Sequence, residues 1–181
     1  MTKKISAGLL MFSRKNGVKV FLVHPGGPFF SNKDEGHWGI PKGLIEDDEV
    51  HLDAAKREFE EETGISPSGE FIPLGNITQK GGKVVFGWAF EVPEDDPITI
   101  KSNTCEVEWP PKSGKIITIP EVDKGEFFTI DEAKIKMKPA QHEFLLRLVS
   151  YLNIPLNKGE QYHIQNSPLI KGDKGGCCID E

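Results

Sequence analysis

Residues 46–62 constrain the fold of this chain more than any other segment. The stretch contains nine acidic residues and two basic ones, a net charge of −7. Its apolar residues recur at the helical spacing i, i+3, i+7, at Leu52, Ala55 and Phe59. Gly64 follows at the position where helices commonly end. The sequence therefore predicts a helix over residues 51–63 that buries one apolar stripe and holds carboxylates close to the core.

The acidity of the protein comes from this segment alone. The chain of 181 residues has a net charge of −6, so all residues outside 46–62 together sum to +1. Without a basic excess the protein has no general attraction for a nucleic-acid backbone, and no nucleic-acid partner is expected. A local cluster of carboxylates suits a divalent cation instead, although acidic runs also occur as solvated helix faces or disordered segments.

The spacing of three glutamates favours the cation. Glu58, Glu61 and Glu62 stand at i, i+3 and i+4, which places them on one helix face with Cβ atoms roughly 5–6 Å apart. Like charges at this spacing destabilise a helix, whereas clustered oxygen ligands suit Mg²⁺ or Mn²⁺. Arg57 can pair with Glu61 or orient a neighbouring glutamate.

The wider segment resembles the signature of the Nudix hydrolases. Nine positions over 23 residues match it in type and spacing: Gly43, Glu49, Arg57, Glu58, Phe59, Glu61, Glu62, Gly64 and Ile65. The resemblance extends over about residues 5–152 and is close to a bacterial subgroup of predicted nucleoside triphosphate pyrophosphohydrolases. It implies an α+β fold, the α/β/α sandwich with a mixed sheet.

The resemblance also implies an activity and roles for residues. The activity is metal-dependent hydrolysis of a nucleoside diphosphate linked to another moiety, with Mg²⁺ (or Mn²⁺) as the cofactor. Glu58, Glu61 and Glu62 would be the metal ligands, and Glu58 or Glu62 the general base. Arg57 would orient a catalytic glutamate, and Glu49 would support the loop or an outer-sphere metal. Glu108 and Glu121 are further candidates for the base or a metal ligand, with ordinary surface positions as the alternative.

The substrate is less well specified than the chemistry. Lys42, in the triplet Pro-Lys-Gly, could meet a phosphate and resembles the branch that acts on dinucleoside polyphosphates. That branch often has a tyrosine at a position equivalent to residues 81–83, which are Gly, Gly and Lys here. We expect a small-molecule nucleotide, either a dinucleoside polyphosphate or a nucleoside triphosphate. The alternative is a nucleotide-sensing binding module of the same fold without turnover.

Turn signals and periodicity predict the remaining elements. Strand pairs are expected at residues 5–12 with 18–24, 71–79 with 83–92, and 104–109 with 115–119. Residues 43–49 are expected to form a loop, and residues 126–130 a short strand. Asp131 is predicted to cap a short helix, and a last helix is predicted from Pro139 to about Leu152.

Composition places the chain among reduced, soluble proteins. One domain is expected over residues 1–154, followed by a disordered tail at 155–181 that lacks apolar periodicity. The cysteines Cys105, Cys177 and Cys178 form no even framework, so no disulfide partner is expected. There is no apolar run of about 20 residues and no signal peptide, which predicts a cytoplasmic protein without membrane contact. The oligomeric state stays open.

Overall fold

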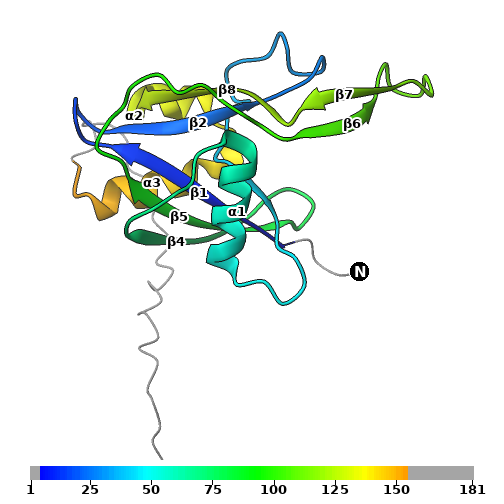
Figure 1. The fold of residues 1–181 in the computed structure, drawn as a ribbon. Helices are drawn as coiled ribbons and strands as arrows, with labels where there is room; N and C mark the ends of the chain where they lie inside the picture. The colour runs from blue at the N-terminus through cyan, green and yellow to red at the C-terminus, as the bar shows by residue number, and fades with distance from the viewer. Residues whose placement is uncertain (1–4, 155–181) are drawn as a thin grey trace, which may run out of the picture.

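The computed structural model describes residues 5–154, which form a mixed β-sheet with helices on both faces (Figure 1). This arrangement confirms the predicted α+β class. The predicted tail lies outside the described residues. The elements in chain order are β1 (Ile5–Ser13), β2 (Lys19–Pro25), β3 (Lys42–Leu44), α1 (His51–Thr63), β4 (Phe71–Thr78), β5 (Val84–Glu91), β6 (Thr104–Glu108), β7 (Ile116–Pro120), β8 (Val122–Thr129), α2 (Ile130–Lys136), a 3₁₀ turn (Pro139–Gln141) and α3 (His142–Tyr151).

The main sheet has the strand order β4-β5-β1-β2-β8, and β3 pairs with β1 off this path. β1 runs parallel to β5 along its whole length, from Ile5 opposite Val84 to Phe12 opposite Glu91. β2 is antiparallel to β1, and its other edge pairs with β8. β1 is therefore the central strand of the sheet, paired with β5 on one edge and with β2 and β3 on the other.

The first predicted hairpin is confirmed, but its two strands separate soon after the turn. β1 and β2 pair only at Phe12 with Val20 and at Ser13 with Lys19. Beyond that point residues 39–41 enter between them. The Leu9 amide donates to the Pro41 carbonyl at 3.1 Å, and the Val23 amide donates to the Gly39 carbonyl at 2.9 Å. The chain then continues into β3, so the prediction of a loop from residue 43 is wrong for residues 43 and 44, which pair with β1.

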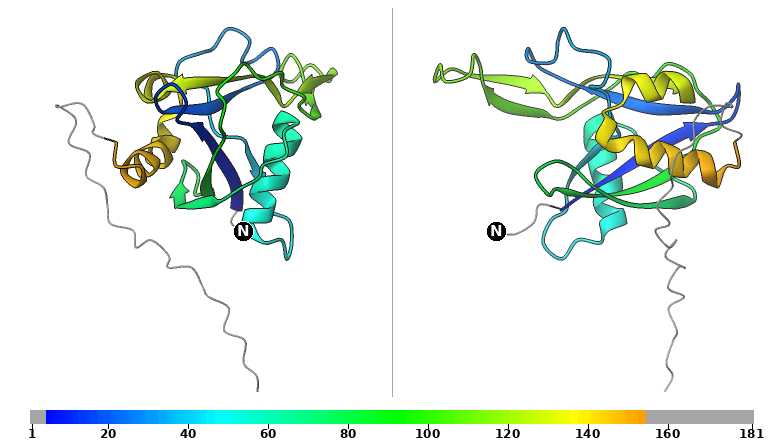
Figure 2. Two further views of the ribbon diagram at one scale, coloured as in Figure 1. Left: turned by 60° about the vertical axis from the view of Figure 1, so that its left-hand side comes forward. Right: turned by 180° about the vertical axis from the view of Figure 1, so that it is seen from behind.

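The two faces of the sheet carry separate cores. α1 packs on one face through Ala55 and Phe59, both fully buried against residues such as Leu9 and Phe90. α2 and α3 cover the other face, where Phe144 and Leu148 of α3 are equally buried. Figure 2 shows α1 on one side of the sheet and the later helices on the other. Truncating a buried phenylalanine of this kind to alanine typically costs about 3–5 kcal/mol of stability.

The end of α1 is as predicted from the sequence, whereas the start of α2 differs from the prediction. Gly64 ends α1 in the left-handed conformation, with φ of 77°, as predicted. α2 is capped by Thr129 and not by Asp131, because Thr129 and Glu132 form a reciprocal capping box. The preceding strand β8 starts at Val122, earlier than predicted, because its whole length pairs with β2. Pro139 opens a 3₁₀ turn, and α3 itself begins at His142.

β6 and β7 form a separate two-stranded hairpin that projects from the body of the molecule (Figures 1 and 2). Cys105 on β6 is a free thiol. Within residues 5–154, no helix combines the length and the apolar character needed to cross a membrane.

Candidate active site

Arg57 of α1 ties the acidic loop to the helix. Its Nε and Nη2 atoms donate to Oε1 and Oε2 of Glu49, each at 2.9 Å, and Nη2 also donates to the Leu44 carbonyl at 3.0 Å. Glu49 in turn accepts from the Glu46 amide at 3.0 Å. The hydrogen bonds from Arg57, followed by that from the Glu46 amide, lower the pKa of Glu49 to about 2. Arg57 therefore links both ends of the loop, at Leu44 and Glu49, to α1.

The same guanidinium reaches two glutamates of the predicted metal site. Nη1 of Arg57 donates to Oε1 of Glu58 at 2.9 Å and to Oε2 of Glu61 at 3.4 Å. Burial raises the pKa of Glu58 above its ordinary value, while the Arg57 hydrogen bond opposes that change. Arg57 therefore contacts two of the three predicted metal ligands, and its orienting role stays a prediction.

Gly43 allows the Glu58 carboxylate to approach β3. A Cβ atom at residue 43 would lie 1.8 Å from Oε2 of Glu58, far inside van der Waals contact. Any side chain at this position would displace the carboxylate. The glycine of the signature is thus required by close packing between β3 and α1.

Glu62 also links α1 to β3, through a hydrogen bond from the backbone of β3. Its Oε2 atom accepts a hydrogen bond from the Lys42 amide at 3.0 Å. Burial, followed by the charges of Glu58 and Glu121, raises the pKa of Glu62 to about 7 against the opposing effect of Lys42. A carboxyl group with this pKa is suited to exchange a proton near neutral pH.

Glu121 lies close enough to this cluster to act on it electrostatically, whereas Glu108 does not belong to it. Glu121 lies between β7 and β8, and its charge contributes to the raised pKa values of both Glu58 and Glu62. Its amide donates to the Asn103 carbonyl, and the Asn103 amide donates to the Glu61 carbonyl, each at 2.9 Å. Glu108 instead accepts from the Gly114 amide at 2.6 Å within the projecting hairpin, where it stabilises the turn.

The donor set fits a divalent cation. Among the described residues no three acidic, histidine or cysteine side chains already converge on one point that could hold a metal ion. Glu58 and Glu61 accept hydrogen bonds from Arg57, whereas Glu62 accepts one from the Lys42 amide. Burial and the charges of neighbouring glutamates nevertheless oppose ionisation of Glu58 and Glu62, and a cation beside them would offset this. Oxygen-only ligands of this kind suit Mg²⁺ or Mn²⁺.

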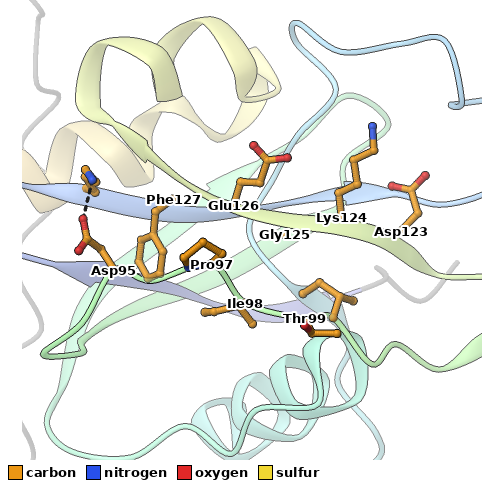
Figure 3. Close-up of a pocket in the computed structure, with 11 residues that line it drawn as sticks. Asp95, Pro97, Ile98, Thr99, Asp123, Lys124, Gly125, Glu126 and Phe127 are labelled. Atoms are coloured by element: carbon orange, nitrogen blue, oxygen red, sulfur yellow. Dashed lines mark hydrogen bonds and ion pairs between the residues drawn. The ribbon is translucent and has the colours of Figure 1, made fainter.

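A cavity of about 630 Å³ lies elsewhere on the same side of the sheet as α1 (Figure 3). It is bounded by β8 and by the linker that contains Asp95 and Ile98, and Lys19 pairs with Asp95 at its margin, Nζ to Oδ2, at 2.5 Å. None of the residues that line it comes from the signature segment. The cavity is therefore separate from the glutamate cluster.

Comparison with known proteins agrees with this architecture. No curated protein matches the chain. Solved structures that resemble it include the NUDIX domain of Shewanella oneidensis NrtR in complex with ADP ribose (TM-score 0.60, 15% identity, 84% of this chain and 90% of that chain covered). A C. elegans Ap4A hydrolase binary complex is similar at TM-score 0.57 and 19% identity, covering 82% of this chain and 97% of that chain. A NUDIX hydrolase from Nitrosomonas europaea gives TM-score 0.57 and 20% identity, covering 86% and 97% respectively.

These structural likenesses establish the fold. The family model described as the NUDIX domain matches residues 2–148, which is most of the chain and includes every position of the signature. The chain therefore belongs to the Nudix hydrolase family.

Proposed function

We propose that the protein hydrolyses a diphosphate bond in a nucleoside diphosphate linked to another moiety, with Mg²⁺ or Mn²⁺ as cofactor. Dinucleoside polyphosphates and nucleoside triphosphates are the proposed substrates. The observation that carries the proposal is the cluster of Glu58, Glu61 and Glu62 on α1, with Arg57 bonded to two of them and Glu62 bonded to β3. All three glutamates are proposed metal ligands.

A bound divalent cation would neutralise phosphate charge and lower the pKa of a water molecule. Glu62 is our candidate for the group that takes the proton from the attacking water, because its carboxylate is fixed between α1 and β3 by the hydrogen bond from the Lys42 amide. Glu58 is the alternative base. Arg57 and Glu49 act as positioning residues, since their mutual hydrogen bonds hold the loop and the glutamates in place. Lys42 is the proposed phosphate-binding side chain.

A phosphate-release assay over a nucleotide panel tests this proposal. With Mg²⁺ present and a coupling phosphatase or pyrophosphatase, the wild type should hydrolyse at least one dinucleoside polyphosphate or nucleoside triphosphate. Glu62→Gln should lower turnover by at least 10²-fold, because it removes a charge at the metal and a proton acceptor without changing volume.

Glu60→Gln is the matched control, because Glu60 hydrogen-bonds to the Ser66 hydroxyl and not to the cluster. It should retain wild-type turnover. Binding of nucleotides by the wild type without any product, at saturating Mg²⁺, would instead identify a nucleotide-sensing module and refute the proposed activity.

A further inference from the structure

The two outermost strands of the main sheet, β4 and β8, differ in how their outer edges are protected. On β4, Pro73 has no amide to donate, and the pairing with β5 is irregular between Pro73 and Gly75. Arg147 of α3 also donates from Nη1 to the carbonyls of Leu74 at 2.7 Å and Asn76 at 3.0 Å. Proline, irregular pairing and covering side chains keep an edge strand from pairing with another chain. The β4 edge is therefore protected.

The outer edge of β8 has none of these features over residues 124–129. This segment contains no proline and pairs with β2 without interruption. Among residues 5–154, β2 is the one strand that pairs with it. The linker after β5 meets the start of β8, where the Val122 amide donates to Oγ of Ser102 at 3.0 Å. Farther along, residues 97–100 and β8 both line the cavity of Figure 3 without forming a strand pair, so the regular part of β8 has an uncovered edge.

Opposite charges flank the middle of this edge. A Cβ atom on Gly125 would lie 2.4 Å from the Phe21 ring and 2.6 Å from Cδ1 of Ile100, both on the α1 face. Side chains alternate along a strand, so Lys124 and Glu126 lie on the opposite face, and both are exposed. Figure 3 shows these two side chains rising from the same side of β8. A positive and a negative side chain thus stand one residue to either side of Gly125.

This charge pattern is complementary to itself. When two antiparallel copies of β8 meet at a two-fold axis through Gly125, Lys124 of each copy lies opposite Glu126 of the other. Residues two apart direct their backbone groups to the same edge, so this register lets the outward groups of both copies pair. An axis at residue 124 or 126 would instead place two lysines or two glutamates opposite each other. The charges therefore favour the register centred on Gly125.

We propose that the chain forms a homodimer through the outer edges of two β8 strands, with the two-fold axis at Gly125 and the main sheet continued across the interface. Lys124 and Glu126 set the register, and Ile100 beside Gly125 supplies apolar cover near the axis. The interface uses none of the residues assigned to metal, phosphate or proton transfer. The dimer is therefore independent of the proposed hydrolysis.

Sedimentation equilibrium of the full chain tests this interface. The wild type should sediment with twice the mass of the 20.1 kDa chain and dissociate on dilution. Lys124→Glu and Glu126→Lys should each raise the dimer dissociation constant at least tenfold, because like charges then lie opposite each other twice in each dimer. Lys80→Glu and Glu70→Lys are the matched controls, since they make the same charge changes at exposed positions outside β8. Both controls should leave the dissociation constant unchanged.

Mixing the two charge-reversal variants distinguishes this dimer from one formed through another surface. An equimolar mixture of Lys124→Glu and Glu126→Lys should form a heterodimer, because an acidic β8 edge then faces a basic one. The double variant should dimerise as the wild type does, since the two charges only exchange places. Thermal melting checks the fold of each variant, and amide hydrogen exchange in residues 123–127 should slow on dimerisation. A wild type that stays monomeric at every concentration, a dimer that both single variants leave intact, or a mixture that does not associate would overturn the inference.

Discussion

Arg57 forms a two-pronged ion pair with Glu49, in which Nε and Nη2 each donate to a separate carboxylate oxygen at 2.9 Å. The two residues are eight positions apart and belong to different segments, the end of the acidic loop and the middle of α1. Paired hydrogen bonds of this geometry are stronger and more directional than a simple contact between charges. The pair therefore defines the shape of the loop that precedes the helix.

The ion pair between Arg57 and Glu49 should make the free energy of unfolding depend on pH. The pKa of Glu49 is about 2 in the folded protein, below its ordinary value of 4.5. Because the folded pKa is lowered, the stabilisation is present above about pH 4.5 and is lost as the pH falls towards 2. Glu49→Gln should thus reduce the free energy of unfolding more at pH 7 than at pH 3, measured by denaturant titration. Equal losses at both pH values would contradict the prediction, and Glu46→Gln serves as the control.

Gly43→Ala should damage both stability and activity. The added Cβ would lie 1.8 Å from the Glu58 carboxylate, so either β3 or the carboxylate must move. Overpacking of this kind costs about 1–3 kcal/mol, and we expect at least a tenfold loss of turnover. The double variant Gly43→Ala with Glu58→Ala should recover stability without recovering activity, because the shorter side chain removes the clash. If the stability losses of the two single variants simply add in the double variant, the clash between residue 43 and Glu58 is not the cause of the destabilisation.

Divalent metal should stabilise the folded protein, and the glutamate cluster should control the effect. A ligand that binds only the native state at one hundred times its Kd adds about 2.7 kcal/mol, which raises Tm by several degrees. In a chelator, Glu61→Gln should melt at or above the wild type because one repelling charge is gone. It should also gain less on addition of Mg²⁺ at matched ionic strength. A variant that melts lower in chelator yet keeps the full metal-induced rise would assign Glu61 a purely structural role.

Thr129→Ala tests the corrected cap of α2. Thr129 and Glu132 satisfy each other's backbone amides, and removing such a cap costs about 0.5–2 kcal/mol. Asp131→Ala, the position favoured by the sequence, should cost clearly less because it lies inside the first turn. Chemical denaturation of both variants measures the difference. A larger loss for Asp131→Ala would mean that charge at the helix start outweighs the capping box.

Local patterns predicted the part of the site that is built from one continuous segment. The stripe through Ala55 and Phe59 and the stop at Gly64 follow from helical spacing alone, and both are as predicted. The contacts of Arg57 with Glu58 and Glu61 were likewise anticipated, because residues one and four positions apart on a helix have few ways to meet. The ion pair between Arg57 and Glu49 was not predicted. The assignment of Glu58, Glu61 and Glu62 as metal ligands stays a prediction.

Features that depend on distant segments were not predictable in this way. Asp131 and Thr129 are both good capping residues, and the choice between them depends on where β8 ends. Nothing local distinguishes Glu121 from Glu108, although the fold brings only the former's charge to bear on the cluster.

The insertion of residues 39–41 between β1 and β2 has a consequence for how the protein recognises ligands. Hydrogen bonds to Leu9 on one side and Val23 on the other hold this segment at both edges. A shift of Lys42 relative to α1 would therefore break contacts with two core strands at once. We expect the segment that leads into β3 to be preformed on folding rather than assembled by induced fit. A ligand at the glutamates would therefore meet a β3 segment whose position is already set by the two core strands, with little freedom to adapt.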